Sequence, residues 1–342
     1  MRLRYRIVGI FVTAVIAVGV AGCPKEQPTG SPPPSSGMGG SAARTDKKSY
    51  TIAVIPKGTK HQFWQSVNAG AQAAAKEDGV TADWGGPANE ASITDQVNLV
   101  ENKITSGVDG IVLAATDKTA LVKPVKDAMA KNIPVVIIDS GIAEPDAAVA
   151  YIATDNVGGG RAAAEALAKA IGEKGTVGLI IFMKGSGSSD DREKGFKEGI
   201  AKYPNIKLVA TLEANDPQKG GEATTNMLTA HPDIVGIFAA NEPNGVGSAN
   251  AIKQLGKTGK VKLVAYDSSD EEIKAINDGV IYATVVQDPY QMGFKGIKTV
   301  LKAIKKEPID QKTIDSGFKV VTKENLNTPE IQKLVNPAGG KK

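Results

Sequence analysis

Cysteine and histidine are scarce in this chain. The only cysteine is Cys23, and the only histidines are His61 and His231. A single cysteine cannot form an internal disulfide or a cysteine-based zinc site, and two histidines cannot supply a metal site that needs several imidazoles. The sequence therefore predicts a protein without a metal ion or other cofactor.

An excess of one charge is also lacking. The formal net charge is +4, and Arg2, Arg4 and Arg6 lie in a leader that we expect to be removed. Without these three, 38 basic residues stand against 37 acidic residues, a net charge of +1. Domains that bind nucleic acid usually carry a basic face, so we expect no nucleic-acid partner.

Catalytic motifs are lacking as well. The chain has no Gly-x-Ser-x-Gly elbow and no His-Glu-x-x-His pair, which are the signatures of hydrolases and zinc peptidases. We interpret His61 as a ligand contact and His231, which precedes Pro232, as a surface residue. The sequence therefore predicts a binding protein and not an enzyme.

The chain has one long apolar run, near its start. Residues Ile7 to Val20 are almost wholly apolar, but the run is shorter than the roughly 20 residues of a comfortable membrane span. It follows the three arginines and ends in Val20-Ala21-Gly22-Cys23, and small residues before a cleavage point are typical of a signal peptide. The position of the sole cysteine resembles the lipobox of bacterial lipoproteins. We therefore expect a signal peptide over residues 1–22 and lipidation of Cys23.

A spacer follows the leader. Residues 23–48 are rich in Pro, Gly and Ser and poor in apolar side chains. Such a composition cannot bury enough surface to offset the entropy lost on ordering, so we predict a flexible tether before a folded part that begins near Ser49. The mature protein is then expected to be extracytoplasmic and attached to the membrane only through its lipid.

From Ser49 onward, short β-branched runs alternate with segments of helical periodicity. The first series of strands runs from Tyr50–Ile55 to Ala148–Ile152, and the second runs from Val177–Phe182 to Tyr282–Val286. This alternation indicates βαβ units and parallel sheets. Each series holds about five strands, and a chain of 342 residues suggests two domains. We therefore predict an α/β fold with two doubly wound parallel-sheet lobes.

Polar and aromatic residues recur just after the predicted strands, where such sheets bind their ligands. Together they offer ring faces, carboxylate acceptors, amides and a guanidinium, which suits a ring with many hydroxyl groups. An alternative is that the Asp and Asn residues only cap the next helices. The residues that supply this chemistry are Phe63, Trp64, Asp139, Arg192, Asn241, Asp267 and Gln287.

Several motifs together identify a family resemblance. They include Phe63-Trp64, Ile133-Pro134-Val135-Val136, Arg192-Glu193-Lys194-Gly195-Phe196 and Phe238-Ala239-Ala240-Asn241-Glu242. From Tyr50 to about Val321, the chain resembles the ribose-binding-protein-like group of type I substrate-binding proteins of ABC sugar importers. The resemblance implies two lobes joined by three crossings, near Ala153-Thr154, near Gln287-Asp288 and roughly at Ser316. It implies a first lobe of residues 49–153 plus 288–315 and a second lobe of residues 154–287 plus 316–342.

The same resemblance implies a ligand site between the lobes. Alignment by the motifs adds three positions that depart from ribose binders, because His61 replaces an Asn, Ser140 replaces an Arg and Asn215 replaces an aromatic residue. Loss of an Arg fork and an aromatic face should change the preferred sugar, so we expect a sugar or polyol other than ribose. The full implied site is His61, Phe63, Trp64, Asp139, Ser140, Arg192, Asn215, Asn241, Asp267 and Gln287.

The resemblance also implies the partners and leaves alternatives open. A monomeric binding protein would deliver its sugar to the permease of an ABC transporter. The same cleft could instead hold a non-sugar or signalling molecule and serve a chemoreceptor or sensor kinase. Sugar-responsive repressors share this core fold, but they carry a DNA-binding head where this chain has its leader and tether.

Overall fold

The computed structural model describes residues 49–336, which belong to one compact unit spanning Thr45–Lys342. The predicted signal peptide, the lipidation position Cys23 and the tether lie outside the described residues. Within residues 49–336, no helix combines the length and the hydropathy that crossing a bilayer would require.

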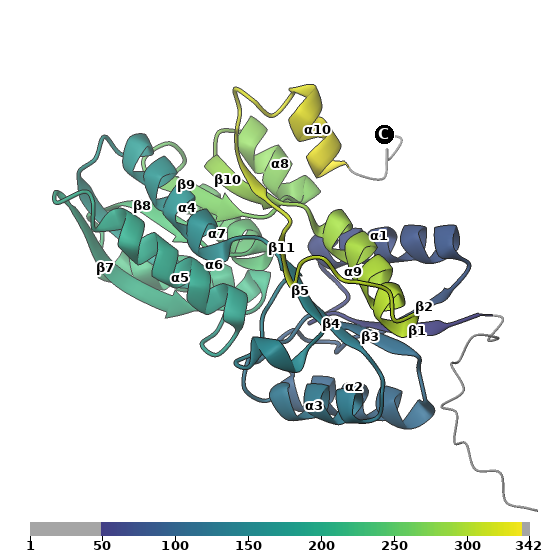
Figure 1. Cartoon of the computed structure of the whole chain (residues 1–342). Helices are drawn as coiled ribbons and strands as arrows, with labels where there is room; N and C mark the ends of the chain where they lie inside the picture. Colours follow the sequence, from purple (N-terminus) through teal and green to yellow (C-terminus); the bar gives the residue numbers. More distant parts are fainter. Residues whose placement is uncertain (1–48, 337–342) are drawn as a thin grey trace, which may run out of the picture. The chain divides into compact units, whose positions relative to one another are not determined.

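Two α/β lobes make up the described part, and each is built on a six-stranded sheet (Figure 1). In the first lobe the strand order is β2-β1-β3-β4-β5-β11, and all neighbouring strands are parallel. These strands are β1 (Thr51–Ile55), β2 (Thr81–Trp84), β3 (Gly110–Leu113), β4 (Val135–Ile138), β5 (Ala150–Ala153) and β11 (Thr313–Asp315).

The second lobe repeats the strand order as β7-β6-β8-β9-β10-β12. It is parallel throughout except that β12 runs antiparallel to β10. Its strands are β6 (Gly175–Ile181), β7 (Ile206–Glu213), β8 (Ile234–Ala239), β9 (Lys262–Tyr266), β10 (Ile281–Gln287) and β12 (Phe318–Thr322). The predicted fold class is confirmed. The edge strands β11 and β12 were not among the predicted strands, and β11 has only one apolar residue, Ile314.

Helices cover both faces of each sheet. In the first lobe, α1 (Gln62–Asp78) and α9 (Pro289–Ile304) pack on one face, and α2 (Ile93–Ser106) and α3 (Val122–Ala130) pack on the other. Because side chains alternate along a strand, Ile52 and Val54 of β1 join the first core and Ala53 and Ile55 join the second. Both faces of the strand are therefore buried, which explains its continuous apolar run. A short 3-10 helix, η1 (Pro145–Ala147), precedes β5.

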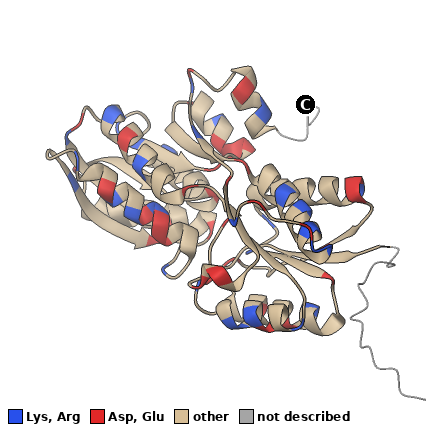
Figure 2. Cartoon of the chain, in the orientation of Figure 1, with Lys and Arg blue, Asp and Glu red and all other residues tan. Residues whose placement is uncertain are grey.

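The second lobe has the same layers. On one face of its sheet lie α4 (Asn156–Ala170) and α5 (Gly187–Ile200). The other face is covered by α6 (Pro217–Ala230), α7 (Glu242–Gln254), α8 (Asp270–Asn277) and α10 (Pro329–Val335). Charged residues of both signs are interspersed along the helices of both lobes (Figure 2).

Each lobe has a helix pair in close glycine-mediated contact. A Cβ atom on Gly70 of α1 would lie 2.0 Å from the carbonyl oxygen of Tyr290 in α9. In the second lobe, a Cβ atom on Gly160 of α4 would lie 2.3 Å from the carbonyl oxygen of Arg192 in α5. Backbones approach this closely only where no side chain intervenes. Of the glycine run at 158–160, Gly160 serves that purpose, while Gly158 and Gly159 face the side chains of Asp155 and Tyr266.

Three segments join the lobes. The chain passes from β5 to α4 at Thr154-Asp155, from β10 to α9 at Asp288, and from β11 to β12 at Ser316-Gly317. The three crossings of the predicted fold are thus present. Two of them are tied together, because the Thr154 hydroxyl lies 3.2 Å from the Ser316 hydroxyl and donates to the Gly317 carbonyl oxygen at 3.3 Å.

Contacts at their first turns position two helices of the second lobe. Helix α5 starts at Gly187. The first turn of α5 is held from the other lobe, because the Ser140 hydroxyl accepts the Ser188 backbone N–H at 3.1 Å. Helix α7 starts at Glu242 because Asn241 caps it, accepting the Asn244 N–H at 3.3 Å.

Candidate ligand-binding site

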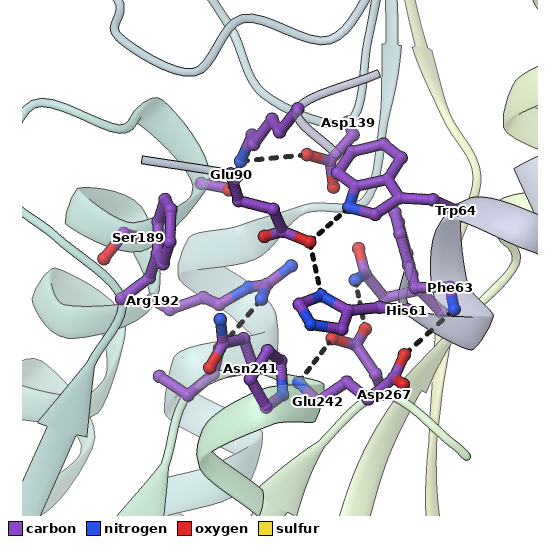
Figure 3. A pocket seen from close by; sticks show the side chains of 16 residues that line it. His61, Phe63, Trp64, Glu90, Asp139, Ser189, Arg192, Asn241, Glu242 and Asp267 are labelled. Atoms are coloured by element: carbon purple, nitrogen blue, oxygen red, sulfur yellow. Dashed lines mark hydrogen bonds and ion pairs between the residues drawn. The ribbon is translucent and has the colours of Figure 1, made fainter. Parts of the chain in front are cut away.

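A cleft between the lobes gathers residues from the carboxyl ends of strands in both sheets (Figure 3). About 40 Å³ of the cleft is open to the centre of a water molecule. Side chains from both lobes line this space. The lining residues are Lys57, His61, Phe63, Trp64, Glu90, Asp139, Phe182, Ser188, Ser189, Arg192, Ala240, Asn241, Glu242, Pro243, Asp267 and Gln287.

The structure brings most of the predicted site residues together in this cleft. Two predicted positions are not among the lining residues. Ser140 is fully buried behind them, where it contacts the hydroxyl groups of Ser186 and Ser188. Asn215 is half-buried and accepts a bond from Lys219 at 3.1 Å. The eight predicted residues that do line the cleft are His61, Phe63, Trp64, Asp139, Arg192, Asn241, Asp267 and Gln287.

The first turn of α1 supplies two aromatic rings. Phe63 and Trp64 are buried, and their ring centroids lie 4.8 Å apart in an edge-to-face arrangement. This geometry is favourable because the positive edge of one ring meets the negative face of the other. Both residues belong to the core beneath α1 as well as to the wall of the cleft. The rings are therefore held by packing before any ligand arrives.

Glu90, in the loop between β2 and α2, fixes two neighbouring side chains. One of its oxygens, Oε1, accepts the indole N–H of Trp64 at 2.6 Å and contacts Nδ1 of His61 at 2.5 Å (Figure 3). Burial alone would lower the pKa of His61, but the hydrogen bond and charge of Glu90 raise that pKa above its ordinary value. The carboxylate thus favours the protonated form of the imidazole.

A buried ion pair also lines the cleft. The ammonium group of Lys57 is 3.1 Å from Oδ2 of Asp139, and the two side chains are only 5% and 3% exposed. Lys57 also donates to the hydroxyl groups of Ser186 and Ser188 at 3.2 and 3.0 Å. Lys57 and Asp139 belong to the first lobe and the two serines to the second, so this cation joins the lobes.

Arg192 lies in α5 and is almost wholly buried. Its Nε donates to Oδ1 of Asn156 at 2.8 Å, and its Nη1 donates to the carbonyl oxygen of Ala240 at 2.8 Å. The guanidinium plane lies 3.7 Å from the centre of the Tyr266 ring, a cation–π contact. These contacts orient the guanidinium group toward the cleft.

Asp267 is held by neutral donors. Its Oδ1 accepts the Gln287 amide at 2.6 Å, and its Oδ2 accepts the backbone N–H of Glu242 at 3.1 Å. Burial raises the pKa of Asp267, while the charge of Arg192 and the bond from Gln287 oppose that rise. Burial likewise raises the pKa of Glu242, to about 7.

Two of the lining aspartates have an unusual backbone. Asp139 follows β4 with φ +57°, and Asp267 follows β9 with φ +79°. Positive φ is uncommon outside glycine, and such strain clusters at functional sites. The turn aims each carboxylate from a strand end into the cleft.

Sequence reasoning missed three charged residues of the cleft. Lys57 comes two residues after β1 and Glu242 comes after β8, so the rule that strand ends carry the site could have found both. Glu90 reaches the cleft from the loop before α2, and we find no sequence signal for that placement. With them the cleft holds four carboxylates against two permanent cations, which suits a neutral ligand rich in hydroxyl donors.

Comparisons with known proteins agree with this geometry. A family model described as a periplasmic binding protein domain matches residues 52–308. The ribose import binding protein of Escherichia coli is 32% identical over 266 residues, which cover 77% of this chain and 87% of that protein.

Solved structures give the same result. A carbohydrate transporter solute binding protein from Agrobacterium radiobacter, in complex with D-arabinose, is 38% identical with a TM-score of 0.82, covering 84% of this chain and 99% of that one. An ABC transporter solute binding protein from Agrobacterium vitis, with bound D-fucose, is 40% identical with a TM-score of 0.81, covering 83% of this chain and 99% of that one.

Proposed function

Because the chain belongs to the periplasmic binding protein family, we propose that it captures a sugar or polyol between its two lobes and delivers it to an ABC importer. The family assignment confirms the predicted resemblance and the prediction of a binding protein rather than an enzyme. The relatives named above bind or import ribose, D-arabinose and D-fucose.

Two unpaired acceptors in the cleft carry the proposal. Oγ of Ser189 and Oε1 of Gln287 are buried, line the cleft and have no hydrogen-bond partner among the described residues. Leaving a buried polar atom unpaired costs about 1–3 kcal/mol. Ligand hydroxyl groups would satisfy both atoms, and the rings of Phe63 and Trp64 would cover an apolar face of the sugar.

Capture requires the lobes to move. Residues of both lobes line the cleft and bond to one another directly, so the ligand would enter while the lobes are apart and would then be enclosed. A ligand that touches both lobes favours the enclosed form by its difference in affinity for the two states. Lys57 of the first lobe and Ser188 of the second lobe, which are hydrogen-bonded and line the cleft, would then lie on the two sides of the enclosed ligand.

The remaining parts of the proposal concern attachment and partners. The lipidated Cys23 would anchor the mature protein outside the cytoplasm, and a monomer would dock on the permease. We further propose lobe boundaries at residues 49–153 plus 288–315 and 154–287 plus 316–342. The grouping of β1–β5 with β11, and of β6–β10 with β12, supports these boundaries.

A thermal-shift screen tests the function. The chain from Ser49 onward would be heated with pentoses, hexoses, deoxysugars and polyols, while tryptophan emission is followed. A ligand at 100 times its dissociation constant adds about 2.7 kcal/mol of stability. A shift with at least one sugar is expected, and no shift with any member of the panel would overturn the sugar proposal in favour of a non-sugar ligand.

A serine variant tests the site itself. Ser189→Ala removes an oxygen that has no partner, so the stability of the ligand-free protein should be unchanged or higher. Affinity for the sugar found in the screen should fall about five- to tenfold, the value of one hydrogen bond of about 1 kcal/mol or slightly more. Ser106→Ala, at the exposed end of α2, is the matched control and should leave affinity unchanged. Equal affinities for the wild type and Ser189→Ala would exclude Ser189 from the site.

A further inference from the structure

Helix α1 has no cap of its own. His61 precedes the helix, and its side chain makes no capping hydrogen bond. The first backbone N–H groups of a helix lack intrahelical partners and need an acceptor from elsewhere. For α1 that acceptor is Glu242, the first residue of α7 in the other lobe. Its Oε1 accepts the Gln62 N–H at 3.1 Å, and its Oε2 accepts the Phe63 N–H at 2.9 Å (Figure 3).

A reciprocal bond lies beside this one. Oε1 of Gln62, in α1, accepts the backbone N–H of Asp270, the first residue of α8 in the second lobe, at 2.5 Å. Each lobe therefore supplies a side chain to a helix N-terminus of the other. Both sets of bonds depend on the lobes being together, because donor and acceptor belong to different lobes.

Glu242 is not needed to cap α7. Asn241 already performs that role through its own side chain. The backbone N–H of Glu242 is fixed by Asp267, a lining residue, so the carboxyl group reaches α1 from a rigid support. Phe63 contributes to α1 both the N–H that Glu242 holds and a ring that lines the cleft.

We propose that Glu242 is a positioning residue that fastens the two lobes, coupling the enclosure of the ligand to the capping of α1. The inference rests on the proposed function, because it assigns a role in ligand capture at the same cleft. Glu242 holds α1, and with it Phe63 and Trp64, against the second lobe. Loss of the bond should therefore speed the escape of the ligand more than it slows its entry.

Hydrogen exchange measures the fastening directly. Amides in the first turn of a helix ordinarily exchange fast, so protection of the Gln62 and Phe63 amides reports the contact with Glu242. When exchange is measured on the sugar-free protein, Glu242→Ala should lose the protection of these two amides. Protection of the amides along β3 should stay as in the wild type. Glu101→Ala, an exposed change on α2 far from this contact, is the matched control and should retain the protection of both amides.

Ligand binding gives the second readout, with the sugar found in the screen. Loss of a cap and its contacts should weaken affinity about tenfold in Glu242→Ala at pH 6, mostly through a faster dissociation rate. Glu242→Gln keeps one amide oxygen as acceptor and should recover part of the affinity. Gln62→Ala removes the reciprocal bond and should show a smaller loss of affinity, again through faster dissociation. This variant tests the fastening role if Glu242→Ala fails to fold.

The two proposals fail in different ways. If no sugar binds, the sugar function is wrong, while exchange of the Gln62 and Phe63 amides still tests the fastening. If sugar binds but Glu242→Ala and Gln62→Ala match the wild type in dissociation rate and amide exchange, the fastening role is wrong and the sugar function stands.

Discussion

Asp139 and Asp267 occupy equivalent places in the two lobes. Each follows the fourth strand of its lobe, each has a positive φ, and each donates its backbone N–H to the fifth strand, to Ile152 and Val285 respectively. Their side-chain partners differ. Asp139 is paired with the cation Lys57, whereas Asp267 is held by the neutral amide of Gln287 and a backbone N–H.

This difference separates what the topology determines from what the side chains determine. The strained turn comes with the strand order that both lobes share, and it aims a carboxylate into the cleft in either lobe. The side chain that pairs with the carboxylate does not follow from the strand order and differs between the lobes. The ionic charge of Lys57 compensates Asp139 in direct contact. For Asp267 the charge of Arg192 acts together with the neutral hydrogen-bond donors. The two aspartates should therefore respond differently when their partners are removed.

Removal of the cation should have the largest effect. Lys57→Met leaves the carboxylate of Asp139 buried without its counter-charge, and breaking a buried ion pair from one side costs about 3–5 kcal/mol of unfolding free energy. Chemical denaturation measures the loss. Lys123→Met, whose side chain is 80% exposed, is the control and should change stability by less than about 0.5 kcal/mol. A loss below about 1 kcal/mol in Lys57→Met would show that Asp139 does not depend on this cation.

The pH dependence of Glu242 should have the next largest effect. Burial raises its pKa from 4.5 to about 7, helped by the charge of Asp267 and opposed by the N–H groups of Phe63 and Gln62. The folded protein therefore binds the proton more tightly than the unfolded chain does. This stabilisation is complete below about pH 4.5 and is lost as the pH rises through 7. The shift corresponds to about 3 kcal/mol.

Comparison with Glu242→Gln isolates that contribution. The charged and titratable groups around Glu242 are His61, Asp267, Glu272, Lys60, Asp270 and Glu271, and they are present in both proteins. Between pH 5 and pH 8, urea unfolding of the wild type should lose about 3 kcal/mol more than unfolding of Glu242→Gln. If the unfolding free energies of the two proteins changed with pH in parallel, Glu242 would be exposed to water and its pKa would not be raised.

Removal of the neutral partner should cost less than removal of the cation. Gln287→Met takes one amide donor from Asp267, and a hydrogen bond to a charged group contributes about 1.5–3 kcal/mol. The remaining backbone N–H and the nearby guanidinium of Arg192 still compensate the carboxylate. Denaturation of this variant beside Lys57→Met gives the comparison directly. A loss larger than that of Lys57→Met would reverse our ranking of the two partners.

The glycine contacts test whether the lobes are alike in packing. Gly70→Ala and Gly160→Ala each place a Cβ atom within 2.3 Å of a carbonyl oxygen of the neighbouring helix, and such overpacking costs about 1–3 kcal/mol. The two losses in thermal unfolding should be similar. Gly85→Ala, where an added Cβ meets no atom within 4 Å, is the control and should leave the unfolding temperature nearly unchanged.

The sequence predicts the part of the site that follows from strand ends. Asp139, Asn241 and Asp267 come after strands, and Gln287 is the last residue of β10. Arg192 lies in α5, the helix that follows β6. Parallel strands bring their carboxyl ends to one edge. The alternative of helix capping was partly right, because Asn241 both caps α7 and lines the cleft.

Other features depend on how distant segments meet, which local patterns do not encode. Glu90 reaches the cleft from a loop, and β11 and β12 find their places only at the edges of completed sheets. Asn215 aligned with a contact position, but in the structure its side chain meets Lys219 outside the cleft. Only the three-dimensional arrangement settles such placements.

The return of the chain to the first lobe has a consequence for biosynthesis. Helix α9 contributes Met292, Ile297 and Val300 to the core beneath α1, yet it is made after all five main strands of the second lobe. A chain that emerges N-terminus first must therefore leave part of one face of its first sheet, beside α1, uncovered until nearly 90% of its residues have appeared, since α9 ends at Ile304 of 342. Exposed apolar surface of this kind invites aggregation, so the first lobe is the one that should need a holding chaperone during export.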